Sequence, residues 1–131
     1  MEEENKISTE YFEISLRDGE VVVIKALGKK WDEKTMDDLV EKYARFIKKL
    51  PQKPKILIDV TLSIPIPSSS IRKGIVEKME YVASLGFEKV AIFGGNMIIK
   101  VTTLFAIAAS RIKNIKRFDT EEEASRWLKK D

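Results

Sequence analysis

Apolar and polar positions follow two different periods along this 131-residue chain. A period of two, typical of half-buried strands, marks residues 11–16, and a second strand-like run covers residues 21–27. The Asp-Gly pair at 18–19 stands between these runs and predicts a hairpin turn. The runs 55–60 and 88–93 are apolar at successive positions, which is typical of parallel strands that are buried on both faces.

A period near 3.6 residues predicts four helices in the remaining segments. Their expected ranges are 32–50, 69–85, 96–111 and 120–128, and a short strand at 114–118 precedes the last helix. Residues that favour helix ends support these limits: Asp32, Pro51, Gly86, Asn96 and a capping box that opens at Thr120.

The predicted order is therefore β-β-α-β-α-β-α-β-α. It indicates an α/β fold with an antiparallel N-terminal hairpin, a parallel remainder of the sheet and flanking helices. We expect one domain over residues 10–131 and a flexible tail over residues 1–9. Ligand sites in such folds lie at the carboxyl ends of the strands, which here are the segments 61–69, 94–96 and 118–120.

Composition excludes several kinds of chemistry. The chain has no cysteine and no histidine, so thiol catalysis, Ser-His-Asp triads and the usual zinc sites are excluded. We therefore expect no catalytic residue of these kinds, no metal site and no cofactor. A formal net charge of +3, with both signs mixed along the chain, is too small to indicate nucleic acid.

The N-terminal segment is acidic and polar, unlike a signal peptide, and no apolar run reaches the roughly 18–20 residues of a membrane span. We expect a cytoplasmic protein without a transmembrane segment. Residues 111–117 include four basic side chains. This segment is interpreted as a solvated basic edge, with contact to anionic lipid or nucleic acid as the alternatives; no aromatic residues interleave it, which weakens the nucleic-acid alternative.

The stretch Ser63-Ile-Pro-Ile-Pro-Ser-Ser-Ser70 lies between a strand and a helix, at the expected binding edge. One interpretation is a helix cap stiffened by two prolines, which would stabilise the helix by roughly 1 kcal/mol. The other is a regulatory or anion site, because free N–H groups at a helix start attract negative charge. Its candidate residues are Ser68, Ser69, Ser70 and Arg72.

Two further features invite more than one interpretation. Asp59 is the only charged residue in the apolar run 56–60. We expect its carboxylate to accept a hydrogen bond from the neighbouring loop, and the alternative is a catalytic carboxylate. The third helix carries two apolar stripes, Met97, Val101, Leu104, Phe105 and Ala108 on one side and Ile99, Thr103 and Ile107 on the other. Two stripes indicate a second cover: a neighbouring element of the chain, a second copy of it, or a small apolar ligand. The candidate surface is Ile99, Thr103 and Ile107.

Three segments carry a resemblance to a known family: EKVAIFGGN at 88–96, the apolar helix after it, and IKRFDTEEEASRWL at 115–128. Together with the order of elements, they resemble the SpoIIAA-like branch of the STAS superfamily, which is related to the CRAL-TRIO lipid-exchange domains. In antagonist STAS domains, a phosphorylatable serine opens the helix after the third strand, within an Asp-Ser-Ser/Ala-Gly motif. In this chain Ser68 or Ser69 occupies the position of the phosphorylatable serine. Pro67 stands where the motif has its aspartate, and Ser70 or Ile71 stands where the motif has its glycine.

The resemblance and the missing catalytic side chains predict a non-enzymatic STAS-type module. It would bind a partner protein or a small ligand, apolar or anionic, at the carboxyl end of its sheet. The alternative is a carrier or sensor of a small apolar or lipid-like ligand seated against the third helix. A third hypothesis is an enzyme that uses only carboxylates and lysines. We also expect a homodimer through the third helix, and no nucleic-acid partner.

Overall fold

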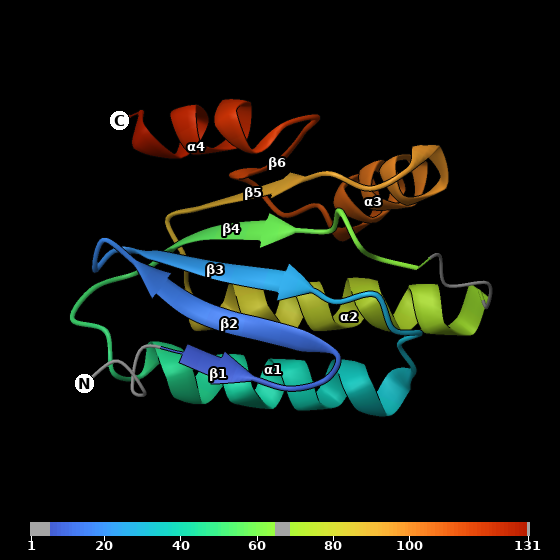
Figure 1. Ribbon diagram of the computed structural model, residues 1–131, viewed down its shortest axis with the longest axis horizontal. Coiled ribbons are helices and arrows are strands. Elements are labelled where there is room, and N and C mark those ends of the chain that lie inside the picture. The colour runs from blue at the N-terminus through green and yellow to red at the C-terminus, as the bar shows by residue number, and fades with distance from the viewer. Residues whose placement is uncertain (1–5, 65–68, 131) are drawn as a thin grey trace.

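The computed structural model describes the backbone of residues 6–64 and 69–130 and the side chains of residues 6–64 and 74–130. Its elements are β1 (Lys6–Ser8), β2 (Phe12–Arg17), β3 (Val21–Ala26), α1 (Glu33–Ile47), β4 (Lys55–Asp59), α2 (Ser69–Leu85), β5 (Lys89–Phe93), α3 (Met97–Ser110), β6 (Ile115–Phe118) and α4 (Glu121–Lys129). The six strands form one sheet in the order β1-β2-β3-β4-β5-β6. The first three pair antiparallel, and β3 to β6 pair in parallel. The predicted α/β fold with an N-terminal hairpin is confirmed (Figure 1).

The first strand lies in the segment that the sequence predicted as a flexible tail. Residues 6–8 pair antiparallel with residues 13–15 of β2. The hydroxyl of Thr9 accepts hydrogen bonds from the backbone N–H groups of Tyr11 and Phe12, both at 3.1 Å, and this turn directs the chain back along β2. A strand of three residues is too short to show a period, so the prediction of a tail over residues 1–9 is wrong for residues 6–8.

The hairpin between β2 and β3 forms at the predicted Asp-Gly pair. Arg17 and Val21 are the last paired residues on either side of the turn. Asp18 and Gly19 both have positive φ angles, of 56° and 72°. That combination belongs to a tight hairpin turn whose twist matches the twist of the flanking strands.

Side chains alternate between the two faces of the sheet and build two cores. The core beneath α1 and α2 contains Phe12, Ile14, Val22, Ile24, Tyr43, Phe46, Ile56, Val90 and Ile92. The core beneath α4 contains Leu57, Ala91, Phe93, Ala124 and Leu128. Figure 1 shows α4 on the face of the sheet opposite to α1 and α2. Successive residues of β4 and β5 therefore enter opposite cores, which explains their continuous apolar runs.

Capping side chains fix where three of the helices begin. Asp32 accepts a hydrogen bond from the backbone N–H of Thr35, Asn96 from that of Ile99, and Thr120 from that of Glu123. These are the caps that the sequence predicted. The first helix ends earlier than expected, at Ile47 rather than before Pro51. In the described part of the chain, none of the helices combines the length and the apolar character needed to cross a bilayer.

Candidate functional site

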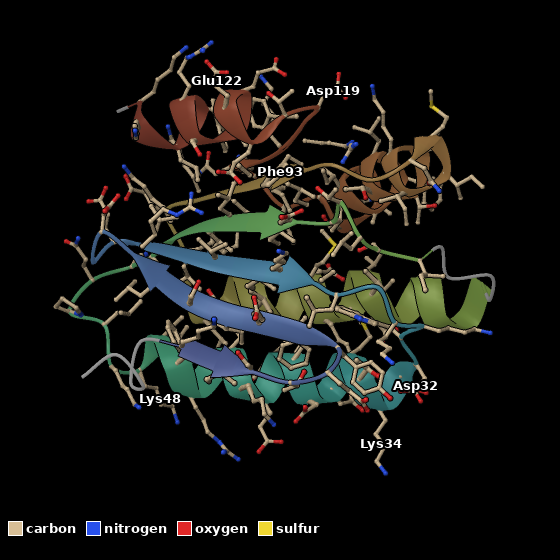
Figure 2. The ribbon with its side chains drawn as sticks, viewed as in Figure 1. Asp32, Lys34, Lys48, Phe93, Asp119 and Glu122 are labelled. Atoms are coloured by element: carbon tan, nitrogen blue, oxygen red, sulfur yellow. The ribbon has the colours of Figure 1, made fainter. Side chains whose placement is uncertain are left out.

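The strands β3, β4, β5 and β6 run in the same direction, so the four junctions that follow them meet at one edge of the sheet (Figure 1). Figure 2 labels three residues of this carboxyl edge: Asp32 at the start of α1, Phe93 at the end of β5 and Asp119 between β6 and α4. The sequence identified three of the junctions and missed the fourth, residues 27–32. The apolar run of β3 resembles that of β4, and that signal could have shown that β3 also ends at this edge.

The loop after β4 is held against the turn after β5. The backbone N–H of Val60 donates to the carbonyl oxygen of Phe93 at 3.0 Å. The carboxylate of Asp59 accepts a hydrogen bond from the backbone N–H of Thr61 at 2.9 Å. The prediction that Asp59 serves the neighbouring loop as a hydrogen-bond acceptor is therefore confirmed, and this bond fixes how the chain leaves β4.

The two glycines after β5 allow the close contact between these loops. Gly94 and Gly95 have φ angles of +92° and +86°, a region that favours glycine. A Cβ atom on Gly94 would meet the side chain of Thr61 and lie 2.9 Å from its backbone nitrogen. The FGGN segment is thus a tight turn capped by Asn96, as the sequence suggested, and glycine is needed because of the neighbouring loop.

A half-buried guanidinium supports this turn from β6. Arg117 Nη2 donates to the carbonyl oxygen of Gly94 at 2.7 Å. Its Nε and Nη1 atoms are buried and have no partner among the described residues. Burial lowers the pKa of the Arg117 guanidinium, and the Asp119 carboxylate opposes this effect. Sequence reasoning had included Arg117 in a solvated basic edge, and only the pairing of β6 with β5 shows that it points to the turn.

A second polar cluster lies at the same edge, at the start of α1. A shallow hollow is lined by Tyr11, Asp32, Lys34, Thr35, Asp37, Asp38 and Glu41. Hydrogen bonds from the backbone and the hydroxyl of Thr35 hold the pKa of Asp32 below its usual value. Asp37 pairs with Lys78 of α2 at 2.9 Å, and Asp38 with Lys42 at 2.5 Å. Each of these three carboxylates therefore has a partner within the protein, and a bound cation is not needed to account for the cluster.

The residues of the predicted regulatory site are only partly covered by the structure. Ser68 lies outside the described residues. Ser69, Ser70 and Arg72 belong to the first turn of α2, and their side chains lie outside the described part of the chain. The anion or regulatory role of these four residues stays a prediction.

The predicted surface of the third helix is wrong. The stripe that contains Ile99 and Ile107 faces the core, and the stripe that contains Val101 and Leu104 is the exposed one. Ile99 is 8% exposed and Ile107 packs against the larger core, so this stripe faces inward. Thr103 is half-buried, and its hydroxyl donates to the carbonyl oxygen of Ile99 at 2.7 Å. Periodicity gives the angle between two stripes but not which of them faces the sheet. The tight turn at residues 94–96 sets that rotation by bringing Ile99 beneath Gly95.

The other stripe of α3 is exposed. We call it the outer stripe; its residues are Met97, Ile98, Val101, Leu104, Phe105 and Ala108. Two more exposed apolar side chains, Leu62 at 50% and Ile64 at 42%, lie in the loop after β4. The carboxyl edge therefore combines polar groups that are engaged in local hydrogen bonds with apolar groups that are exposed.

The fold is similar to that of two solved proteins. The anti-sigma factor antagonist SpoIIAA in its unphosphorylated form superposes with a TM-score of 0.57 at 18% sequence identity, over 89% of this chain and 95% of that chain. The chain has a SpoIIAA-like STAS fold. The protein TM1081, solved by NMR, gives a TM-score of 0.56 at 16% identity, over 95% of this chain and 92% of that one. Neither a scan of protein-family models nor a search of curated proteins gives a match.

This SpoIIAA-like fold is the fold that the resemblance of the three sequence segments implied. At 16–18% identity the likeness establishes the fold alone. It extends over nearly the full length of both solved chains.

Proposed function

We propose that the protein is a non-enzymatic binding module of the STAS type that engages a partner protein through the carboxyl edge of its sheet. The similar SpoIIAA is an anti-sigma factor antagonist, which makes a protein partner the natural first candidate. A cytoplasmic location, predicted from the sequence, is part of this proposal.

One observation carries it: polar side chains at this edge hold their own loops, and two large apolar side chains of the same edge are left exposed. Asp59, Asn96 and Thr120 each accept a backbone hydrogen bond from their own junction. Leu62 and Ile64 are half-exposed beside them. Exposed apolar groups framed by a rigid edge favour binding, since catalysis needs free groups of matched chemistry.

The experiment is a quantitative capture of partners by the immobilised protein, followed by calorimetry with each purified candidate. We expect a partner whose affinity falls at least about tenfold when Leu62→Ser and Ile64→Ser are combined, because both side chains would lose buried apolar contact. Tyr81→Ser is the matched control, since Tyr81 is also 50% exposed but lies within α2.

The proposal is contradicted if every captured protein binds the double variant as well as it binds the wild type. A reaction catalysed by the purified chain and lost in Asp59→Asn would instead support the carboxylate and lysine enzyme considered from the sequence. The carrier alternative placed a ligand against the third helix, with Ile99, Thr103 and Ile107 as the candidate surface. Those side chains face inward, so this surface does not support that alternative.

A further inference from the structure

Exposed apolar surface is concentrated on α3. Of the nine large hydrophobic side chains that are exposed in the described residues, five belong to this helix. Met97 and Phe105 are the most exposed, at 70% and 71%. A helix that merely covers a sheet needs only one apolar face, so its second face requires another explanation.

α3 has four polar residues, and none of them belongs to the outer stripe. Lys100 pairs with Asp119 at 3.1 Å, Thr103 donates to its own helix, and Ser110 is buried. Thr102 is half-buried and borders the stripe beside Ile98 and Phe105. The outer stripe therefore presents only apolar side chains. A charged or strongly polar partner surface would gain nothing there, because its groups would be desolvated without a counterpart.

The spacing of the outer stripe matches the surface of another helix. Met97, Val101, Leu104 and Ala108 are separated by four, three and four residues, the spacing by which helices interlock side by side. This spacing reads the same in both directions. Two copies of α3 that cross antiparallel about a two-fold axis near residues 102–103 would therefore place these positions opposite one another.

Side-chain size supports the same arrangement. The N-terminal end of the outer stripe has the large Met97 and the C-terminal end the small Ala108, so an antiparallel pair sets large against small at both ends. A parallel pair would set Met97 against Met97 and leave a gap between the alanines. Self-complementarity of this kind is what a two-fold symmetric interface requires.

The exposed area of the outer stripe reaches the lower end of the range for a specific protein interface. The five large side chains, exposed by 47–71%, amount to roughly 600 Å² for each chain, compared with the about 800 Å² a side of a standard protein interface. A patch of this extent is at the upper end of what a monomer leaves open to water.

We propose that the outer stripe of α3 is a homodimer interface in which the α3 helices of two copies of this chain pack antiparallel. The outer stripe belongs to α3, whereas the residues that we propose for partner binding belong to the loop after β4, so substitutions can test either proposal alone.

Sedimentation of the wild-type protein at micromolar concentration tests the interface. We expect twice the mass of one chain, and Leu104→Glu should weaken the dimer by about a hundredfold or more, because each dimer would bury two unpaired carboxylates. Leu62→Glu is the control: Leu62 is 50% exposed and Leu104 47%, and Leu62 lies outside α3. Its mass should remain that of the dimer, and circular dichroism should show both variants folded.

Single cysteines test the direction of packing, because the chain has none of its own. A mixture of Met97→Cys and Ala108→Cys proteins should form a mixed disulfide on mild oxidation. Met97→Cys alone should not cross-link, since the two copies of that position lie at opposite ends of the interface.

A wild-type protein that stays monomeric overturns the proposal, and so does a dimer that Leu104→Glu leaves unchanged. Cross-linking of Met97→Cys with itself overturns the antiparallel arrangement. If the wild-type monomer instead floats with anionic lipid vesicles and Leu104→Glu does not, a bilayer is the occupant of the outer stripe and the dimer is wrong.

Discussion

The side chain of Tyr43 is the clearest conflict between burial and chemistry at the level of single residues. It is 1% exposed within the larger core, and its hydroxyl has no hydrogen-bond partner among the described residues. Burial raises the pKa of the Tyr43 phenol above its ordinary value of 10.0. The aromatic ring fills the core between α1 and the sheet, whereas the hydroxyl makes no contact that the fold requires.

Tyr43→Phe should therefore raise the free energy of unfolding by about 1 kcal/mol at neutral pH, because an unpaired buried hydroxyl is removed. The raised pKa adds a dependence on pH. In the unfolded chain the phenol ionises near pH 10, but the folded protein keeps it neutral, so the wild type loses stability as the pH rises through that value. The advantage of the variant should widen between about pH 9 and about pH 11 in denaturant titrations.

Tyr81→Phe serves as the control. Tyr81 is 50% exposed, so its replacement should leave the free energy of unfolding unchanged at neutral pH and in the alkaline range. A Tyr43→Phe protein that is less stable than the wild type at neutral pH would show that the hydroxyl has a partner after all.

Glycines set the geometry of individual turns and helices. Replacement of two of them by alanine should change the free energy of unfolding in opposite directions. Gly94 has a positive φ angle and lies against Thr61, so a Cβ atom there meets both strain and backbone. Gly74 lies inside α2, where a Cβ atom would meet nothing within 4 Å.

We predict that Gly94→Ala lowers the free energy of unfolding by about 2–4 kcal/mol. Gly74→Ala should raise it by about 0.5–1 kcal/mol, because alanine favours the helix interior. Chemical denaturation of both variants measures the two effects. If both variants change the free energy of unfolding by the same small amount, the loop after β4 moves to accommodate the added Cβ atom and does not constrain the turn.

The same turn explains what sequence reasoning could and could not find in α3. Asn96 as a cap, the position of the helix and the presence of two apolar stripes all follow from local patterns. The inward choice of Ile99 over Val101 depends on how the turn rotates the helix relative to the sheet. That rotation arises from contacts with Val60 and Thr61, some thirty residues earlier in the chain, so periodicity alone does not contain it.

The whole molecule is held together by strands that serve both cores. Ile56 and Leu57 are successive residues of β4, and each is 1% exposed in a different core. Lys89 at the start of β5 donates to the carbonyl oxygen of Trp127 at 3.0 Å and so ties α4 to the sheet. Because β4 and β5 cannot lose one core and keep the other, we expect the chain to unfold as one unit.

The two tryptophans allow a direct test. Trp31 packs on Phe12 near the larger core, and Trp127 packs on Phe118 at the smaller one. In the variants Trp31→Phe and Trp127→Phe, the remaining indole reports on one core, and each should give a single transition that coincides with circular dichroism. Adding Leu128→Ala should lower stability by about 2–4 kcal/mol in both backgrounds.

If the Trp127 signal is lost at lower denaturant concentration than the Trp31 signal, α4 unfolds separately and the two cores are independent. A shift confined to the protein that retains Trp127 would lead to the same conclusion.

The fold of the whole molecule was largely readable from the sequence, because alternating strand and helix patterns leave few arrangements of the sheet. The candidate site was less readable. Its position at the carboxyl edge followed from the order of elements, but the contact of Arg117 with Gly94 depends on strand pairing over 23 residues. The strand β1 was missed because three residues carry no pattern.

That short strand has a consequence for how the protein behaves at high concentration. An exposed sheet edge can recruit strands of other molecules and seed aggregation, and the risk grows with the length of the unpaired edge. Here the sheet ends in the three residues of β1, and one of them is Lys6. At its opposite end, β6 has four residues and includes the exposed Lys116. Both margins are short and carry positive charge, so stacking into fibres should be disfavoured, and encounters with other molecules are left to helices and loops.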